Sequence, residues 1–187
     1  METMKTLLSR RSISKLKSPH PSKEEMDEVY QAALRAPDHS WLRPWKFIEV
    51  TGDSRNKLGR AFVNSTKKTE EVDEDRENKI VSLPLRSPMI IVVVAKINHD
   101  KPNVPRLEQI QSTAAAAQNI LLALHDKGYG AYWRTGKYSS ERNEHISSQL
   151  QLGINDEVLG YLYVGTPEID APKIPELENK NFVTYWD

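Results

Sequence analysis

The sequence contains no cysteine, and this absence excludes disulfide scaffolds, thiolate zinc sites and cysteine nucleophiles together. Glycine is scarce, at 8 of 187 residues, and glycine and proline together number 19, which is too few for a low-complexity chain. The longest apolar run, Met89–Ala95, is far shorter than the roughly 20 residues that cross a bilayer. Residues Met1–Ser12 carry charges throughout and lack the apolar stretch of a signal peptide. We therefore expect a soluble, cytoplasmic protein without a membrane partner.

An excess of charge of either sign is also missing. The 26 basic and 26 acidic residues cancel to a net charge of zero. This balance argues against a nucleic-acid partner, because a dedicated nucleic-acid surface needs a basic face. A chain of 187 residues has the length of one ordinary domain and buries about 70% of its unfolded surface. No repeat or linker divides the sequence, so we expect a single domain over residues 1–187.

Several common catalytic motifs are absent. No G-x-G-x-x-G follows an expected strand and no G-x-x-x-x-G-K-[ST] occurs, which disfavours Rossmann and P-loop nucleotide sites. The five histidines show no i, i+4 pairing, so a zinc hydrolase is disfavoured and we expect no metal site. No G-x-S-x-G nucleophile elbow is present. The sequence therefore offers no dedicated catalytic side chain.

The first half of the chain alternates helical and extended patterns. Ser22 and Glu25 have the spacing of a capping box at a helix start, and Pro37 ends that helix. The alternating segment Trp45–Thr51 is rich in β-forming residues and predicts a strand. Further helices are expected at residues 1–9, from Asp53 or Ser54 to about Lys67, and, as an exposed helix or mobile lid, at Thr69–Val81.

The second half contains the most apolar patterns. Met89–Ile97 is an unbroken β-branched run and predicts a central strand covered on both faces. Arg106–Lys127 is the longest helical pattern, and Gly128 is suited to end it. Its expected apolar stripe is Ile110, Ala114, Ala117, Leu121 and Leu124. The remaining expected elements are a strand at Tyr129–Thr135, a helix from Ser140 to near Leu152, and a strand at Val158–Val164.

Two short motifs carry candidate binding chemistry. Arg10-Arg11-Ser12 offers two guanidinium groups and a hydroxyl, which suits a phosphate. The same residues also fit an ordinary helix end, where cations are favoured and a serine starts a turn. Trp133-Arg134-Thr135 lies where a strand passes into a loop, the usual place for ligand contacts in α/β sheets. A buried tryptophan beside a surface arginine explains this second motif equally well.

The order of these motifs resembles that of the nitroreductase superfamily, and specifically its short, single-domain NAD(P)H nitroreductases. The segments that carry the resemblance are Arg10-Arg11-Ser12, Arg35-Ala36-Pro37-Asp38-His39, Pro44-Trp45-Lys46-Phe47, Trp133-Arg134-Thr135-Gly136 and Gly160–Pro167. The resemblance implies an α+β fold with a central mixed sheet of four to five strands flanked by helices. It also implies an intertwined homodimer with FMN at the interface, and a C-terminal tail, from about residue 168, that reaches the partner subunit.

The resemblance also implies site residues. Those that would bind FMN are Arg10, Arg11, Ser12, Trp133, Arg134 and Thr135 from one subunit and Arg35 and His39 from its partner. Those that would bind NAD(P) are Ala123, Leu124, His125, Asp126, Lys127 and Gly128. No side chain is implied as a catalytic acid or base, because the flavin supplies the reactive atoms and the protein supplies position and electrostatics.

The function implied is an FMN-dependent oxidoreductase that uses NAD(P)H to reduce electron-poor acceptors, nitroaromatics or quinones, by a ping-pong hydride mechanism. The alternatives are another flavin reaction on the same scaffold, reductive dehalogenation or dehydrogenation, and a flavin-binding protein without turnover. A further interpretation is a helical interaction domain without a cofactor, which the ordered motifs disfavour. The chain departs from many relatives at Trp41, where they carry a small residue, so this side chain is expected to narrow the acceptor pocket or stack on a substrate.

Overall fold

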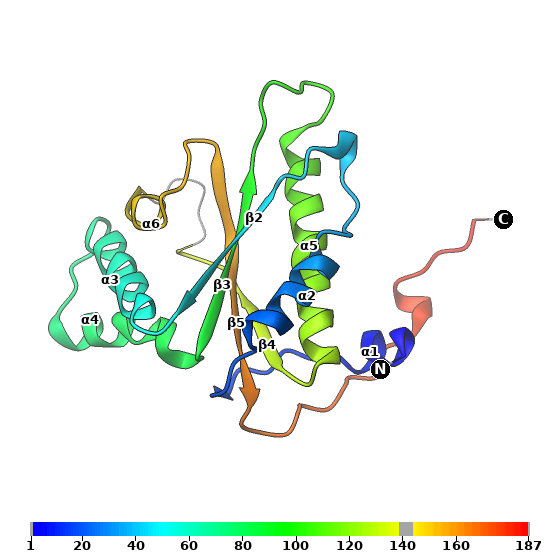
Figure 1. Ribbon diagram of the computed structural model, residues 1–187, viewed down its shortest axis with the longest axis horizontal. Coiled ribbons are helices and arrows are strands. Elements are labelled where there is room, and N and C mark those ends of the chain that lie inside the picture. Colours follow the sequence, from blue (N-terminus) through cyan, green and yellow to red (C-terminus); the bar gives the residue numbers. More distant parts are fainter. Residues whose placement is uncertain (1, 139–143, 187) are drawn as a thin grey trace.

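The computed structural model describes residues 2–138 and 144–186. Its helices are α1 (Thr3–Ser9), α2 (Lys23–Ala33), α3 (Ser54–Lys67), α4 (Glu74–Val81), α5 (Arg106–Asp126) and α6 (Glu144–Gln149), with short 3-10 turns η1 (His39–Trp41), η2 (Leu83–Arg86) and η3 (Asn179–Asn181). Its strands are β1 (Leu16–Lys17), β2 (Trp45–Thr51), β3 (Met89–Lys96), β4 (Gly130–Arg134) and β5 (Asp156–Pro167). The sheet lies between α2 and α5 on one face and α3, α4 and α6 on the other (Figure 1).

The five strands form one open sheet in the order β1-β5-β3-β2, with β4 also paired to β5. The expectation of an α+β sheet of this size is confirmed. The expected mixed arrangement is corrected, because every pairing between described strands is antiparallel. The reason is that the chain leaves and re-enters the sheet at the same end. Thr51 at the end of β2 lies opposite Met89 at the start of β3, and Lys96 at the end of β3 lies opposite Asp156 at the start of β5.

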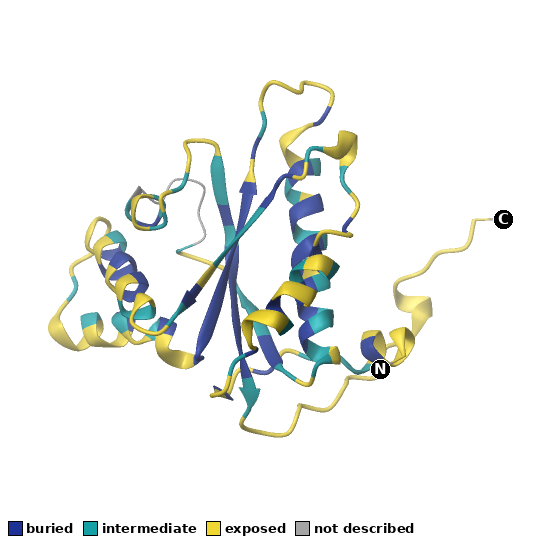
Figure 2. Ribbon diagram, in the orientation of Figure 1, coloured by how far each residue is buried: buried dark blue, intermediate teal, exposed yellow. Residues whose placement is uncertain are grey.

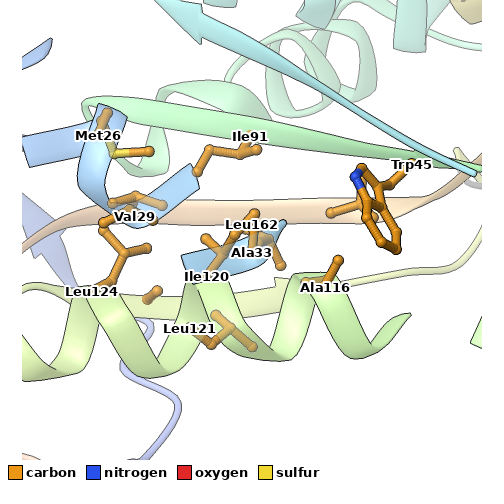
Figure 3. Packing of buried hydrophobic residues seen from close by; sticks show 14 of the residues in the cluster. Met26, Val29, Ala33, Trp45, Ile91, Ala116, Ile120, Leu121, Leu124 and Leu162 are labelled. Carbon is orange, nitrogen blue, oxygen red and sulfur yellow. The ribbon is translucent and has the colours of Figure 1, made fainter. Parts of the chain in front are cut away.

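Strand β3 is the centre of the core, as its sequence predicts. Residues Met89–Ala95 are all buried, and successive side chains point to opposite faces of the sheet. Ile91 and Val93 pack with α2 and α5, on the face where Figure 3 shows Ile91, whereas Val92 and Val94 pack with α3 and α6. Figure 2 shows β3 buried between these layers. Because burying one such aliphatic side chain contributes about 1.5–3 kcal/mol, this strand joins two hydrophobic clusters into one stable scaffold.

The helix starts and ends follow the sequence closely. Ser22 accepts a hydrogen bond from the Glu25 backbone N–H, and the Glu25 carboxylate accepts from the Ser22 N–H, so the capping box of α2 is confirmed. At the end of α5, Gly128 has φ +86° and its N–H donates to His125 O. A glycine adopts this left-handed conformation without the steric cost that other residues carry.

The buried face of α5 differs in part from the expected stripe. Ala117, Leu121 and Leu124 are buried as predicted, but Ile110 and Ala114 are only half-buried. Polar Gln109 and Thr113 are buried instead. The Gln109 amide bonds to the N–H and C=O of Asn98 and to Val104 O, and the Thr113 hydroxyl donates to Gln109 O and Pro44 O. These bonds satisfy loop backbone groups in the core, which lets polar side chains occupy buried positions.

The charged segment between α3 and α4 is tied down by ion pairs. The Glu70 carboxylate pairs with Arg76 and with Lys137, and Lys67 pairs with Glu77. These bonds lower the pKa of Glu70, with the Lys137 hydrogen bond as the largest cause. Ile80 anchors α4 by burial in the core. Of the helix expected at Thr69–Val81, only Glu74–Val81 is helical, and the ion pairs of Glu70 tie the charged residues before it to α4 and to Lys137.

The C-terminal tail is exposed along its whole described length, residues 168–186 (Figure 2). It ends in large apolar side chains, of which Trp186 is 100% exposed. The expected contact of this tail with a partner subunit stays a prediction. The start of the helix expected at Ser140 lies outside the described residues, and the described α6 ends at Gln149. Among the described residues, no helix is both long and apolar enough to cross a membrane.

Candidate functional site

Helix α1 lies against the C-terminal end of α5, and the segment that follows α1 continues beside β4. The Ser9 hydroxyl and His125 Nε2 are 2.8 Å apart, and the Thr6 hydroxyl donates to Asp126 Oδ1 at 3.0 Å. The Ile13 N–H donates to Ala131 O at 3.0 Å, which places the segment beside β4 as well. Arg10-Arg11-Ser12 is therefore fixed at a junction of α5 and β4, two elements that the sequence predicts but does not bring together.

We call Ser9, Arg10, Arg11 and His125 the arginine cluster. Burial lowers the pKa of His125, and the nearby charges of Arg10 and Arg11 lower it further. Two cations thus lie close to the imidazole and disfavour its protonated form. Within residues 2–138 and 144–186, the buried Arg11 Nε has no hydrogen-bond partner. A buried donor left unpaired costs about 1–3 kcal/mol, so this position favours an anionic ligand that accepts from Arg11.

The motif at the end of β4 presents its side chains to both faces of the sheet. Trp133 packs on the face of α2 and α5, and its Nε1 lies 3.4 Å from Leu159 O. A Cβ at Gly160 would lie 2.2 Å from Trp133 Nε1, so only glycine leaves room for this indole. Arg134 projects to the other face, where its charge opposes the burial that raises the pKa of Tyr163 to about 12. The structure therefore does not place Trp133 and Arg134 on one surface.

The loop after α2 carries the other expected flavin contacts. Arg35 is exposed and, with α1 and α5, lines a groove of about 420 Å³ that Ala123 also borders. His39 Nδ1 lies 2.6 Å from Glu108 Oε2. Glu108 is in the first turn of the 21-residue helix α5 and His125 is in its last turn, so about 25 Å of helix separates them. Within one chain, His39 and the arginine cluster lie at opposite ends of α5.

Residues 38–43, which we call the Asp38 loop, form a strained and closely bonded turn. The Asp38 carboxylate accepts from the Arg43 N–H and from Arg43 Nη1, both at 2.8 Å, and its side chain is only 3% exposed. Ser40, Trp41 and Arg43 have φ of 57°, 59° and 51°. A non-glycine residue in this region costs of order 1–3 kcal/mol. Arg43 also lies over the Trp41 ring, 5.0 Å from its centroid. No sequence pattern predicts this geometry, beyond the presence of Asp38 and Arg43.

The stretch expected to bind NAD(P) is the last turn of α5 and the two residues after it. Its side chains have separate surroundings. Leu124 is fully buried in the core, Asp126 accepts from Thr6, and the Lys127 ammonium pairs with Glu28. Ala123 and His125 face the groove and the arginine cluster respectively. Leu124 therefore contributes packing, Asp126 and Lys127 already have partners within the chain, and NAD(P) binding by this stretch stays a prediction.

Comparison with known proteins gives consistent matches over the full chain. A model of the Nitroreductase family matches residues 7–166. The Escherichia coli (strain K12) protein named "Putative NAD(P)H nitroreductase YdjA" is 31% identical over 187 residues, which cover 100% of both chains.

Two solved structures share the fold. The nitroreductase-like family protein from Bacillus cereus has a TM-score of 0.80 at 24% identity, over 99% of this chain and 96% of that one. The FMN-dependent nitroreductase NfnB from Mycobacterium smegmatis, solved in complex with NADPH, has a TM-score of 0.76 at 16% identity, over 98% of this chain and 97% of that one. The three-layer α+β architecture is thus the nitroreductase-like fold.

Proposed function

This chain belongs to the nitroreductase family, a family of oxidoreductases, and from that premise we propose that it is an FMN-dependent enzyme. It takes electrons from NAD(P)H and passes them to electron-poor acceptors, nitroaromatics or quinones, which use the same site in turn. The name of the E. coli relative supports the electron donor, and the NfnB structure supports the flavin. The observation in this chain that carries the proposal is the unpaired, buried Arg11 Nε.

The arginine cluster fits the phosphate of FMN. Arg10 and Arg11 supply cationic donors, Ser12 supplies an exposed hydroxyl next to them, and Arg11 Nε lacks an acceptor among the described residues. A hydrogen bond to a charged group contributes about 1.5–3 kcal/mol, so three or four of them account for micromolar affinity. FMN carries a single phosphate, so no glycine-rich loop is required.

The separation of the two groups of expected flavin contacts supports a homodimer. About 25 Å of α5 lies between the arginine cluster and the Glu108 partner of His39. One chain therefore does not bring His39 and the arginine cluster to a common ligand, whereas His39 of a second copy can face the arginine cluster of the first. Arg35 borders the groove beside α1 and Ala123 of its own chain, so the separation argument rests on His39 alone. The exposed Phe182, Tyr185 and Trp186 of the tail supply apolar surface for contact with that copy.

When bound, FMN would supply the chemistry of hydride and electron transfer between NAD(P)H and the acceptor. The residues of this chain bind and orient. Arg10, Arg11 and Ser12 hold the phosphate, and Trp133, fixed beside Gly160, closes the end of β4. In the protein without ligand, burial and the charges of the two arginines lower the pKa of His125. No side chain needs to transfer a proton in this assignment.

The test is the visible absorption spectrum of the purified protein, followed by anaerobic addition of NADH and then NADPH. We expect the bands of oxidised flavin, bleached rapidly by at least one nicotinamide. A flavin spectrum that neither nicotinamide bleaches would favour a different flavin reaction or a flavin-binding protein. A colourless protein that binds no added FMN would contradict the cofactor assignment.

A further inference from the structure

Trp41 is a large apolar side chain that the fold holds in solvent. It is 81% exposed, although tryptophan is among the side chains that gain most from burial. Its backbone φ of 59° belongs to the left-handed region that favours glycine, and Ser40 beside it has φ 57°. A bulky residue in this conformation persists only where the surrounding structure determines it. An exposed indole in a strained turn therefore points to a role in contact with a ligand.

The surrounding bonds fix the position of the indole. Asp38 accepts two hydrogen bonds from Arg43, one from its N–H and one from its side chain. The same guanidinium lies over the Trp41 ring at 5.0 Å from the centroid. Beyond the loop, Pro44 O accepts from the Lys96 N–H at 2.7 Å, which ties the end of the loop to the sheet. Arg43 thus occupies one face of the indole, and the opposite face stays open.

Trp41 lies close in the chain to His39, an expected flavin contact. Trp41 follows His39 by two residues, and consecutive Cα atoms are 3.8 Å apart, so their Cα atoms lie within about 8 Å. Indole is an electron-rich ring, and aromatic pairs favour offset stacking. The chemistry that matches this face is a planar, electron-poor ring, which is also the chemistry of an acceptor that reoxidises a flavin.

We propose that Trp41 is a specificity-determining residue that stacks on planar, electron-poor ring acceptors, with the Asp38–Arg43 pair holding the indole in place. This inference rests on the proposed function, because it assigns an acceptor class to the same flavin site. It predicts that Trp41 acts in the oxidative half-reaction with ring acceptors. It also predicts that acceptors without a planar ring, such as ferricyanide, do not depend on Trp41.

The experiment compares the FMN-loaded wild-type dimer with W41A and W41F. Flavin is first reduced with NADH or NADPH under anaerobic conditions, and reoxidation by a 1,4-naphthoquinone or by ferricyanide is then followed by stopped flow. For W41A we expect the Kd of the naphthoquinone to rise about two- to tenfold, equivalent to about 0.4–1.4 kcal/mol. W41F is expected to retain most of the affinity, because phenylalanine also stacks. L85A, which removes an exposed apolar side chain of η2, is the control and should leave the Kd unchanged.

Each outcome decides between the two proposals. A wild-type flavin that neither nicotinamide reduces would overturn the proposed function, and with it the assignment of Trp41. If the wild type turns over but W41A changes naphthoquinone and ferricyanide equally, or changes neither, the stacking role alone is overturned. A loss in W41F as large as that in W41A would also overturn stacking, because it would show that the ring itself does not provide the contact.

Discussion

The arginine cluster and the Asp38 loop differ in whether their charged side chains find hydrogen-bond partners within the chain. In the arginine cluster, Arg11 Nε is buried without a partner among the described residues. In the Asp38 loop, Asp38 pairs with Arg43 and His39 pairs with Glu108. An incomplete cationic site gains free energy when an anion arrives, whereas a loop with its charges already paired gains little. The comparison assigns cofactor affinity to the first region and acceptor selectivity to the second.

Replacing Arg11 tests the arginine cluster, and its expected effect, on the Kd for FMN, is the largest. R11M keeps an unbranched side chain of similar length but removes the guanidinium. We expect the Kd for FMN to rise about 10- to 100-fold, since a hydrogen bond to a charged group contributes about 1.5–3 kcal/mol. Fluorescence quenching of FMN measures the Kd. R60M, at an exposed arginine on α3, is the control, and an affinity for R11M within twofold of the R60M value would contradict the assignment.

Removing the charge of Asp38 tests the Asp38 loop, whose charges are already paired. D38N keeps the size of the side chain but weakens both bonds to Arg43. We expect a loss of about 1–2 kcal/mol in the free energy of unfolding, with the partial exposure of Arg43 keeping the loss modest. The naphthoquinone Kd should rise while the FMN Kd stays within about twofold.

Urea denaturation and the two titrations together measure these quantities. D53N, at the exposed N-cap of α3 where the side chain makes no capping bond, is the control for charge loss. If D38N weakens FMN as strongly as R11M does, the division between affinity and selectivity is wrong.

A smaller effect is expected on the pKa of His125 when FMN binds to the arginine cluster. Burial, Arg10 and Arg11 now lower this pKa, and a bound phosphate adds negative charge that favours the imidazolium. We therefore expect FMN to raise the pKa of His125, and by linkage FMN binds more tightly as the pH falls through that range. NMR titration with and without FMN measures the shift, and H125N identifies the resonance. A pKa that stays fixed or falls on adding FMN would contradict a phosphate in the cluster.

Stability of the FMN-free protein should depend on pH in the same window. The folded pKa of His125 lies below its unfolded value, so the unfolded chain binds the proton more readily. Stability is therefore fully present above the unfolded pKa, about 6.5, and decreases as the pH falls through the lowered folded value. H125N should reduce this slope in urea denaturation experiments at pH 5–7. An unchanged slope would place the titrating group elsewhere.

The local elements were largely predictable because their signals are local. The capping box at Ser22 and Glu25, the strand Trp45–Thr51 and the continuous apolar run at Met89 depend on neighbouring residues, and all three are confirmed. The antiparallel sheet was not predictable in the same way. Its strand directions depend on where the long connections through α3 and α5 re-enter the sheet, which no short pattern records.

The site was predictable as a set of motifs but not as an arrangement. Arg10-Arg11-Ser12 suggested a phosphate, yet the contact of the neighbouring Ser9 with His125 in the last turn of α5 requires the folded chain. Ser40 and Trp41 are not residue types that signal positive φ, so the strained turn was missed. The expected apolar stripe of α5 left out Gln109 and Thr113. The backbone groups that they satisfy, Val104 O and Pro44 O, belong to other segments, so the helical pattern does not indicate them.

The most direct measurement compares FMN with riboflavin, which lacks the phosphate, as ligands of the wild type and of R11M. Isothermal titration calorimetry provides both affinities. The account predicts that the wild type binds FMN about 10- to 100-fold more tightly than riboflavin and that R11M loses most of this preference. A wild type that binds the two flavins equally, or an R11M that keeps the full preference for FMN, would contradict the claim that the unpaired Arg11 forms the phosphate site.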